Sequence, residues 1–221
     1  MTKKDYISIF SPDLDSIQIS PLTFLYQCNK ILALPFSACA NIQVLYLKFK
    51  YNKDEFISKY LDDYLAIAAI IYLTCRINNL NRKTRDIVNV CYHILHPYSE
   101  HLKLGDAFYK MRDSLFEAEL IVLRVLNFDI QAEYPHQYIE EWATKVLPLG
   151  EDNQTELDYH RDIIQSAWFF ANQCINCPEI ILEYKSFTIS RVCIYLALRC
   201  CNSSSQELLN VIIILNILFF Y

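Results

Sequence analysis

The feature that most restricts the fold of this sequence is residues 64–77, a stretch that is apolar on every face of a helix. It reads Tyr-Leu-Ala-Ile-Ala-Ala-Ile-Ile-Tyr-Leu-Thr-Cys-Arg-Ile. A membrane-spanning helix needs about 20 apolar residues, so this stretch is too short to cross a bilayer. A shorter helix without a polar face must be surrounded by other helices. The stretch therefore predicts the central helix of an all-α domain.

Glycine is scarce, because the 221 residues include only Gly105 and Gly150. Average usage of about 7% would give about fifteen. Two isolated glycines cannot form a dinucleotide-binding fingerprint, a P-loop or a G-x-S-x-G elbow. They also argue against a β-sandwich or barrel, whose tight turns favour glycine at positive φ. The composition thus supports an all-α fold and excludes these kinds of active site.

Apolar residues recur at helical spacing in further segments, which predict the other helices. These segments are roughly 23–34, 37–49, 85–95, 106–128, 137–146, 158–173 and 187–201. Thr84 and Asp106 are suitable N-cap residues for two of them, and residues 48–55 form a polar connection. The run Ile194-Tyr-Leu-Ala-Leu198 resembles Ile71-Tyr-Leu-Thr-Cys75, which indicates an internal repeat of helical domains.

The predicted helices fall into two groups joined by a linker at 129–135. We expect a flexible N-terminal lead, a first helical box, a partial second box and a hydrophobic tail. Their residues are 1–21, 22–130, 131–205 and 206–221. The first group supplies five helices and the second only three, so the second box is expected to be incomplete. The apolar end 208–221 is too short for a membrane span, which favours a last packing helix or an alternatively spliced end over an anchor.

Charge and hydropathy point to a protein partner. The net charge of −5 and the pI near 5.5 give no basic footprint for nucleic acid. Hydrophobic residues make up 53% of the chain, which leaves apolar surface for a partner. No signal peptide is recognisable at the N-terminus, which predicts an intracellular protein, in the nucleus or the cytoplasm, with reduced cysteines.

The sequence contains one C-x-x-C motif and two adjacent carboxylate pairs that could form metal, redox or acid–base sites. The motif Cys174-Ile-Asn-Cys177 has no second pair at zinc-binding spacing, so buried or incidental thiols are favoured over a metal or redox site. The carboxylate pairs 62–63 and 140–141 are expected to be solvated helix ends. We predict no metal, no cofactor and no small-molecule ligand.

Histidines form one local cluster. His93 and His96 lie three residues apart, with His101 nearby, but no further ligand is placed beside them. Loop or surface histidines are therefore favoured over a metal site. His136, in the linker, is expected to make a structural hydrogen bond and not to act in catalysis.

Six short runs share their order and spacing with a known family. The runs are Tyr46-Leu-Lys-Phe49, Ile71-Tyr-Leu73, Thr84-Arg-Asp-Ile-Val-Asn-Val90, Arg112-Asp-Ser114, Glu119-Leu-Ile-Val-Leu-Arg-Val-Leu-Asn-Phe128 and Pro135-His-Gln-Tyr138. On these runs, residues 64–95 and 108–139 resemble a cyclin box. Within the cyclins the chain most resembles the cyclin-Q (cyclin M) family, the partner of cyclin-dependent kinase 10.

The resemblance implies two five-helix boxes with the third helix of each buried at the centre, as predicted for 64–77. It also implies a regulatory subunit and not an enzyme, because a cyclin carries no catalytic residue. A cyclin packs on the regulatory helix and activation segment of a kinase, and so positions the kinase's Lys–Glu pair and Mg²⁺-binding loop. The expected partner is cyclin-dependent kinase 10 or a close relative, with roles in the cell cycle or transcription. Neither nucleic acid nor a membrane is expected as a direct partner.

The resemblance further implies kinase-contacting residues. Cyclins use a basic residue at the end of the third helix and a glutamate in the fifth, which match Arg76 and Glu119. Arginine replaces the usual lysine, and Asn78 and Asn79 replace two acidic residues, so affinity or kinase choice is expected to differ. The expected kinase-binding residues are Arg76, Glu119, Tyr72, Asn78, Asn79 and Arg112.

Two alternatives remain open at this point. Instead of a kinase activator, the chain could be a cyclin-fold adaptor that activates no kinase. It could also be a truncated isoform that binds its kinase poorly or not at all. The short second box and the two asparagines motivate the second alternative. A DNA-facing adaptor would need a basic surface, which the net charge of −5 argues against.

Overall fold

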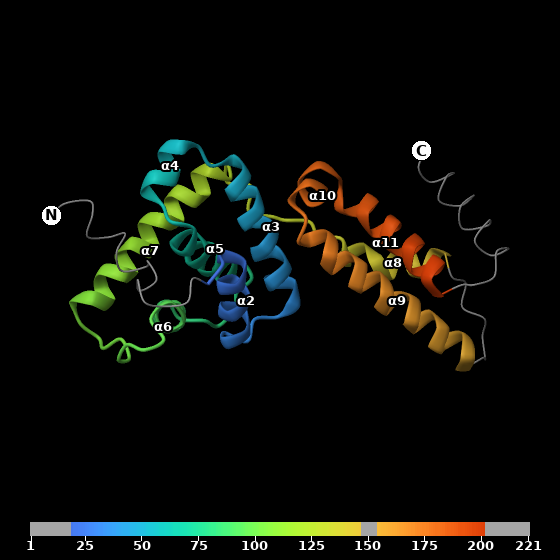
Figure 1. The fold of residues 1–221 in the computed structure, drawn as a ribbon, viewed down its shortest axis with the longest axis horizontal. Coiled ribbons are helices and arrows are strands. Elements are labelled where there is room, and N and C mark those ends of the chain that lie inside the picture. Colours follow the sequence, from blue (N-terminus) through green and yellow to red (C-terminus); the bar gives the residue numbers. More distant parts are fainter. Residues whose placement is uncertain (1–18, 147–153, 202–221) are drawn as a thin grey trace. The chain divides into compact units, whose positions relative to one another are not determined.

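The computed structural model describes residues 19–146 and 154–201, and every regular element in these ranges is an α-helix (Figure 1). The predicted all-α class is therefore confirmed. The chain divides into two compact units, with unit 1 ending at Ala132 and unit 2 beginning at Glu133. None of the helices in the described ranges combines the length and the apolar character needed to cross a membrane. The predicted tail at 206–221 lies outside the described residues.

Unit 1 is built around the helix predicted from residues 64–77. This helix, α5, contacts four others and lies at the middle of the unit (Figure 1). Its buried residues run almost without interruption from Leu65 to Cys75, and Ala66 and Ala69 have no exposed surface. The described helices of unit 1 are α2 (Pro21–Ile31), α3 (Phe36–Asn52), α4 (Glu55–Tyr60), α5 (Asp63–Ile77), α6 (Thr84–Leu95) and α7 (Asp106–Val125).

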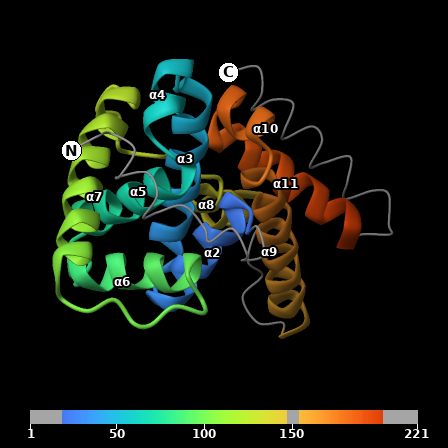
Figure 2. The same cartoon turned by 60° about the vertical axis from the view of Figure 1, so that its left-hand side comes forward.

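Unit 2 consists, in its described part, of four helices. They are α8 (His136–Val146), α9 (Gln154–Ile175), α10 (Pro178–Glu183) and α11 (Ser186–Cys201). Helix α11 packs along both α8 and α9 (Figure 2). Ala167, Ala171 and Ala197 have no exposed surface, and such small side chains allow helices to approach closely. Helix α9 begins at Gln154, four residues before the predicted start at 158.

Two short helices, α4 and α10, were not predicted. Helix α4 begins at the end of the expected polar connection 48–55, where the Asp54 carboxylate accepts the Ile57 N–H at 2.8 Å as an N-cap. Helix α10 begins with Pro178 at its first position, where the missing N–H costs no hydrogen bond. The described part of unit 1 thus has six helices instead of five, and that of unit 2 four instead of three.

In unit 1, the starts of the predicted helices differ from expectation by at most two residues. Thr84 is the first residue of α6, not its N-cap, and the Asp86 carboxylate accepts the N–H of the N-cap residue Lys83 at 3.2 Å. Asp106 is likewise the first residue of α7, after Gly105. Helix α2 begins at Pro21, two residues before the predicted start at 23, and Ser20 Oγ caps it by accepting the Thr23 N–H at 3.2 Å.

Three helices end in a left-handed residue that is not glycine. The φ angles are 46° at Ala33, 50° at Asn79 and 51° at Asn127. At each end the last turn closes with paired backbone hydrogen bonds of the Schellman type, such as the Leu80 N–H to the Cys75 carbonyl at 2.9 Å. Asparagine tolerates this conformation better than most residues. Helix α7 therefore ends at Val125, three residues before the predicted end at 128.

Several side chains are more buried than the sequence indicated. Asp63 is only partly solvated, and its carboxylate accepts hydrogen bonds from the Tyr46 hydroxyl at 3.3 Å and the Lys53 ammonium at 2.5 Å. Burial raises the pKa of the neighbouring Asp62 carboxyl. His96, expected in a loop or at the surface, is buried at the end of α6. The pair 140–141 is exposed, as predicted.

A buried arginine joins α8 to α11 within unit 2. The Arg191 guanidinium lies over the rings of Phe187 and Trp142, with centroid distances of 3.9 and 4.1 Å. The two rings themselves meet edge to face at 5.0 Å. Burial lowers the pKa of this guanidinium. A cation–π contact of a desolvated cation is worth about 2 kcal/mol. The contacts of Arg191 with the two rings therefore contribute substantially to the packing of α11 against α8.

We expect Arg191→Ala to lower the free energy of unfolding of unit 2 by about 2 kcal/mol, because it removes both the cation and its packing. Urea unfolding followed by tryptophan fluorescence measures this directly, since both tryptophans of the chain, Trp142 and Trp168, lie in unit 2. The matched control is Arg199→Ala on the exposed side of α11, for which a change within about 0.5 kcal/mol is expected. Equal midpoints for the two variants would contradict this prediction.

Candidate functional site

An ion pair joins two of the predicted site residues, Arg76 on α5 and Glu119 on α7. Arg76 Nη1 donates to Glu119 Oε1 at 3.0 Å and to Oε2 at 3.4 Å. The Arg76 side chain is 62% exposed, whereas the Glu119 side chain is only 11% exposed. The carboxylate therefore lies beneath the guanidinium, and most of the arginine remains accessible to a partner. Helix α5 provides the arginine from its last turn and α7 provides the glutamate.

Aromatic rings extend this pair along the surface of the two helices. The Arg76 guanidinium lies over the Tyr72 ring at 5.5 Å, and the Tyr72 and Phe116 rings lie 5.6 Å apart. The Phe116 ring in turn lies 6.0 Å from the Arg112 guanidinium. We call these residues, Tyr72, Arg76, Arg112, Phe116 and Glu119, the α5–α7 face. The structure thus brings together four of the six predicted site residues.

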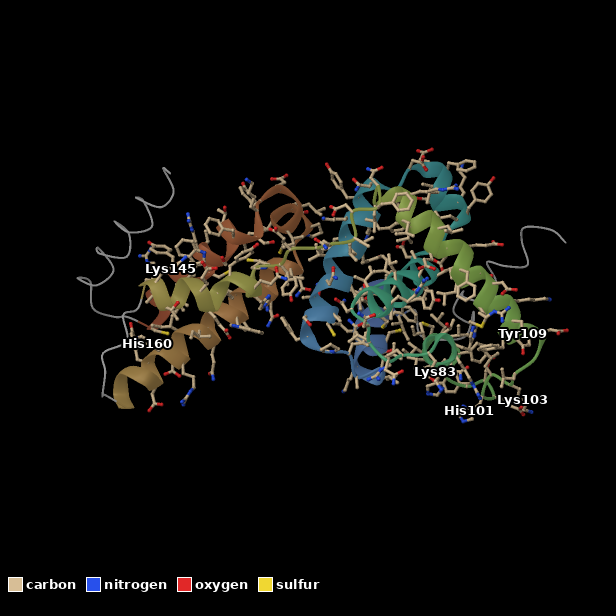
Figure 3. All side chains as sticks on the ribbon, turned by 180° about the vertical axis from the view of Figure 1, so that it is seen from behind. Lys83, His101, Lys103, Tyr109, Lys145 and His160 are labelled. Carbon is tan, nitrogen blue, oxygen red and sulfur yellow. The ribbon has the colours of Figure 1, made fainter. Side chains whose placement is uncertain are left out.

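Helical periodicity explains why the α7 residues of this face lie in one row. Arg112, Phe116 and Glu119 are separated by four and three residues, the spacing of one helix face. The row continues towards the start of α7, where Arg112 lies over the Tyr109 ring at 5.0 Å. Tyr109 is labelled in Figure 3, at the end of unit 1 that also carries His101. Arg112 further pairs with Asp113 at 2.7 Å.

Asn78 and Asn79 serve to end α5. The Asn78 side-chain amide donates to the Thr74 carbonyl at 3.1 Å, and Asn79 adopts the left-handed conformation that closes the last turn. Both are exposed and follow Arg76 directly in the chain after Ile77. No described hydrogen bond links their side chains to Glu119. Their local role is thus a helix cap placed beside the α5–α7 face.

Phe116 is a member of the face that the sequence analysis missed. It is 37% exposed and lies between Tyr72 and Arg112. Its position in the sequence, four residues after Arg112 and three before Glu119, could have indicated that it shares their helix face. An exposed leucine, Leu120 at 58%, adds apolar surface next to Glu119. The face therefore combines one buried carboxylate, two arginines and two aromatic rings.

The opposite flank of α7 borders a separate groove of about 840 Å³. Helix α4 forms its other wall, with Phe56 and Tyr60, and α7 contributes Glu117 and Arg124. Glu117 is exposed and belongs to this groove and not to the α5–α7 face. It thus provides a glutamate on the same helix against which Glu119 can be compared.

Histidines and other metal-ligating side chains form no second candidate site in the described parts of the two units. Within residues 19–146 and 154–201 there is no group of three or more metal-ligating side chains. The His93 and His101 rings lie 6.2 Å apart at the surface, while His96 packs on Tyr92 at 4.7 Å. His136 is buried against the Trp168 ring at 4.8 Å, and burial lowers its pKa. Both observations agree with structural roles for these histidines.

The fold has a clear counterpart among solved structures. A chain of the yeast RNA Pol II CTD kinase CTDK-1 complex matches with a TM-score of 0.62, covering 93% of this chain and 58% of that one. Its sequence identity is 15%, so the match concerns the fold. No family model matches the sequence.

Curated relatives were found by sequence. Cyclin-L1 of Xenopus laevis is 31% identical over 173 residues, which cover 76% of this chain and 32% of that protein. Cyclin-L1 of Homo sapiens is 29% identical over 192 residues, covering 85% and 34%, respectively. Cyclin-L2 of Mus musculus is 27% identical over 173 residues, covering 76% and 31%. The chain thus spans about a third of the length of these relatives.

The described parts of the chain are all-helical, and the first unit presents the α5–α7 face at its surface. The sequence relatives are cyclins, and over 76% of its length this chain is similar to one of them. The expected resemblance to the cyclins is therefore confirmed at the level of the family.

Proposed function

We propose that the chain is the regulatory subunit of a cyclin-dependent Ser/Thr protein kinase and binds it through the α5–α7 face. The observation that carries the proposal is the Arg76–Glu119 pair, at the two positions where cyclins contact their kinase. The pair is held between two helices of the same unit, so it is formed before any partner binds. A preformed site costs less ordering entropy on binding than a flexible one.

The chemistry of the face suits a kinase helix as its ligand. The exposed Arg76 guanidinium can donate charge-assisted hydrogen bonds to carbonyl or carboxylate groups of the partner. Tyr72, Phe116 and Leu120 offer apolar contact surface beside it. Interfaces commonly concentrate their binding energy in such arginine and aromatic residues. The buried Glu119 carboxylate would orient the arginine while the kinase docks.

Activation would follow from differential binding. A cyclin that contacts the active arrangement of the kinase more favourably than the inactive one shifts the kinase towards the active state. In that arrangement the kinase's Lys–Glu pair and Mg²⁺-binding loop are positioned for phosphoryl transfer. The kinase then supplies all catalytic groups and the nucleotide site, and this chain supplies the helical surface that positions them.

The specific kinase is part of the proposal. The resemblance to cyclin Q makes cyclin-dependent kinase 10, or a close relative, the first candidate. The name of the yeast structural neighbour, an RNA Pol II CTD kinase complex, makes a kinase acting in transcription the second. Arg76 in place of lysine, and Asn78 and Asn79 in place of two acidic residues, would then adjust the choice among kinases.

Co-purification with a panel of cyclin-dependent kinases, kinase 10 included, tests the binding part of the proposal. We expect one or a few kinases to be retained by the chain at equimolar amounts, and Arg76→Ala to reduce their retention. Retention of no kinase by the parent chain would contradict the regulatory-subunit function. Stable binding without any rise in kinase activity would instead favour the adaptor function.

A further inference from the structure

The C-x-x-C motif of the sequence is not a pair in the structure. Cys174 lies in the last turn of α9, while Cys177 is the N-cap residue of α10. The sulfur nearest to Cys174 belongs to Cys193 on α11, with a Sγ–Sγ distance of 4.0 Å. Helices α9 and α11 pack side by side in both Figure 1 and Figure 2. The motif thus contributes one thiol to a contact between two helices of unit 2.

The two sulfurs of this contact differ in access. Cys174 is half-buried and keeps part of its surface open to solvent, whereas Cys193 has no exposed surface. The hydrogen bond from Cys193 lowers the pKa of Cys174 to about 7, and the same contact together with burial raises the pKa of Cys193. The accessible sulfur is thus the nucleophile of the pair, because the thiolate is the reactive form of cysteine.

A second thiol pair provides an internal comparison. Cys28 on α2 and Cys91 on α6 have their sulfurs 3.9 Å apart, nearly the same separation. Both residues have no exposed surface, and burial raises the pKa of Cys28. This pair has the proximity of Cys174 and Cys193 without access from solvent, and the raised pKa of Cys28 disfavours its thiolate. Any difference in reactivity between the two pairs would therefore come from access and ionisation, not from distance.

We propose that Cys174 and Cys193 are a modification site at which hydrogen peroxide forms an intrachain disulfide between α9 and α11. The Cys174 thiolate attacks the peroxide, whose O–O bond breaks to give a sulfenic acid on Cys174 and hydroxide, which takes up a proton to become water. The Cys193 thiol then attacks the sulfenic sulfur, its proton leaves with the hydroxyl group as a second water, and the S–S bond forms. Two thiols lose two electrons, and the peroxide gains them.

Formation of this bond requires the two sulfurs, 4.0 Å apart, to come closer together. A disulfide has an S–S length of about 2 Å, so the two sulfurs must approach each other by about 2 Å. Rotation of the two side chains about their Cα–Cβ bonds moves the sulfurs over distances of this size. The product cross-links α9 to α11 across a loop that contains α10. Such a cross-link restricts the unfolded chain and should raise the urea midpoint of unit 2.

Peptide mapping of the full chain tests the proposal. The reduced protein is treated with hydrogen peroxide, its remaining thiols are alkylated under denaturing conditions, and its peptides are identified by mass spectrometry without reduction. We expect a cross-linked peptide containing Cys174 and Cys193, while Cys28 and Cys91 remain alkylated. The matched control Cys177→Ser should form the same cross-link as the parent chain.

Two variants keep the proposal falsifiable if one of them folds poorly. Cys193→Ala should leave Cys174 as a sulfenic acid that dimedone traps, and Cys174→Ser should abolish both products. Far-UV circular dichroism establishes whether each variant is folded. A Cys174–Cys177 cross-link would overturn the proposal, as would a Cys193 thiol that stays fully alkylatable after Cys174 has been oxidised. Oxidation of Cys28 and Cys91 at the same rate would also overturn it.

Discussion

Glu119→Ala is expected to weaken binding to the kinase partner roughly thirtyfold, a loss of about 2 kcal/mol. The Glu119 carboxylate is buried beneath Arg76 and accepts both of its hydrogen bonds. Without it, the guanidinium loses its fixed orientation, and the partner must order a flexible side chain. Truncation of one member of a buried, hydrogen-bonded charge pair commonly costs 2 kcal/mol or more at an interface. Isothermal titration with the kinase retained in co-purification measures the change.

The control for this prediction lies on the same helix. Glu117→Ala removes an exposed glutamate from the groove between α4 and α7 and should leave affinity within about twofold, since exposed charges contribute little. Glu119→Gln keeps the shape of the side chain but removes its charge, and an intermediate loss is expected. Unchanged affinity of Glu119→Ala would mean that the kinase does not use the α5–α7 face.

Ile70→Ala is expected to lower the free energy of unfolding of unit 1 by about 2–5 kcal/mol, the range observed when a fully buried isoleucine is truncated. Ile70 has no exposed surface and lies near the middle of α5, the helix that contacts α2, α3, α6 and α7. A cavity at this position therefore borders several helices, which cannot all move to fill it. This is the stability test of the central-helix prediction.

The measurement must report on unit 1, and tryptophan fluorescence does not, because both tryptophans lie in unit 2. Amide hydrogen exchange along α5 and α7, as a function of urea, follows the correct unit. Ile31→Ala is the matched control, since Ile31 is 54% exposed on α2 and its truncation should cost less than about 1 kcal/mol. Equal losses for the two isoleucines would contradict a core centred on α5.

The long helices were predictable because their apolar residues repeat over many turns. Residues 64–77 have no polar face, and the row of α7 from Phe108 to Val125 steps by three and four. The six-residue helices α4 and α10 complete fewer than two turns, so no period can be recognised in them. Their only signals were local: Asp54 as an N-cap and Pro178 at a first helical position.

Helix ends were harder to predict because this chain rarely uses glycine. A helix usually ends at a glycine in the left-handed conformation, and here Ala33, Asn79 and Asn127 take that place. Alanine gives no sequence signal for such an end, and asparagine gives a weak one. This is why the predicted helix at 106–128 extends past Val125. It also explains how the fold forms with two glycines in the whole chain.

The ion pair between Arg76 and Glu119 could not have been predicted from local sequence. Arg76 and Glu119 are 43 residues apart, and only the resemblance to the cyclins associated them before the structure placed them 3.0 Å apart. Phe116 was missed because an aromatic residue on a helix is usually explained by the core. Burial of Asp63 was missed because its partners, Tyr46 and Lys53, lie on and just after another helix.

Kinase activity in the presence of this chain tests the central claim most directly. The phosphorylation rate of a peptide substrate is measured for the co-purifying kinase alone and with increasing amounts of the chain. The proposal predicts a saturable rise in rate that Glu119→Ala shifts to higher concentrations and Glu117→Ala leaves in place. A kinase that binds the chain and gains no activity at saturation would contradict the proposed regulatory function.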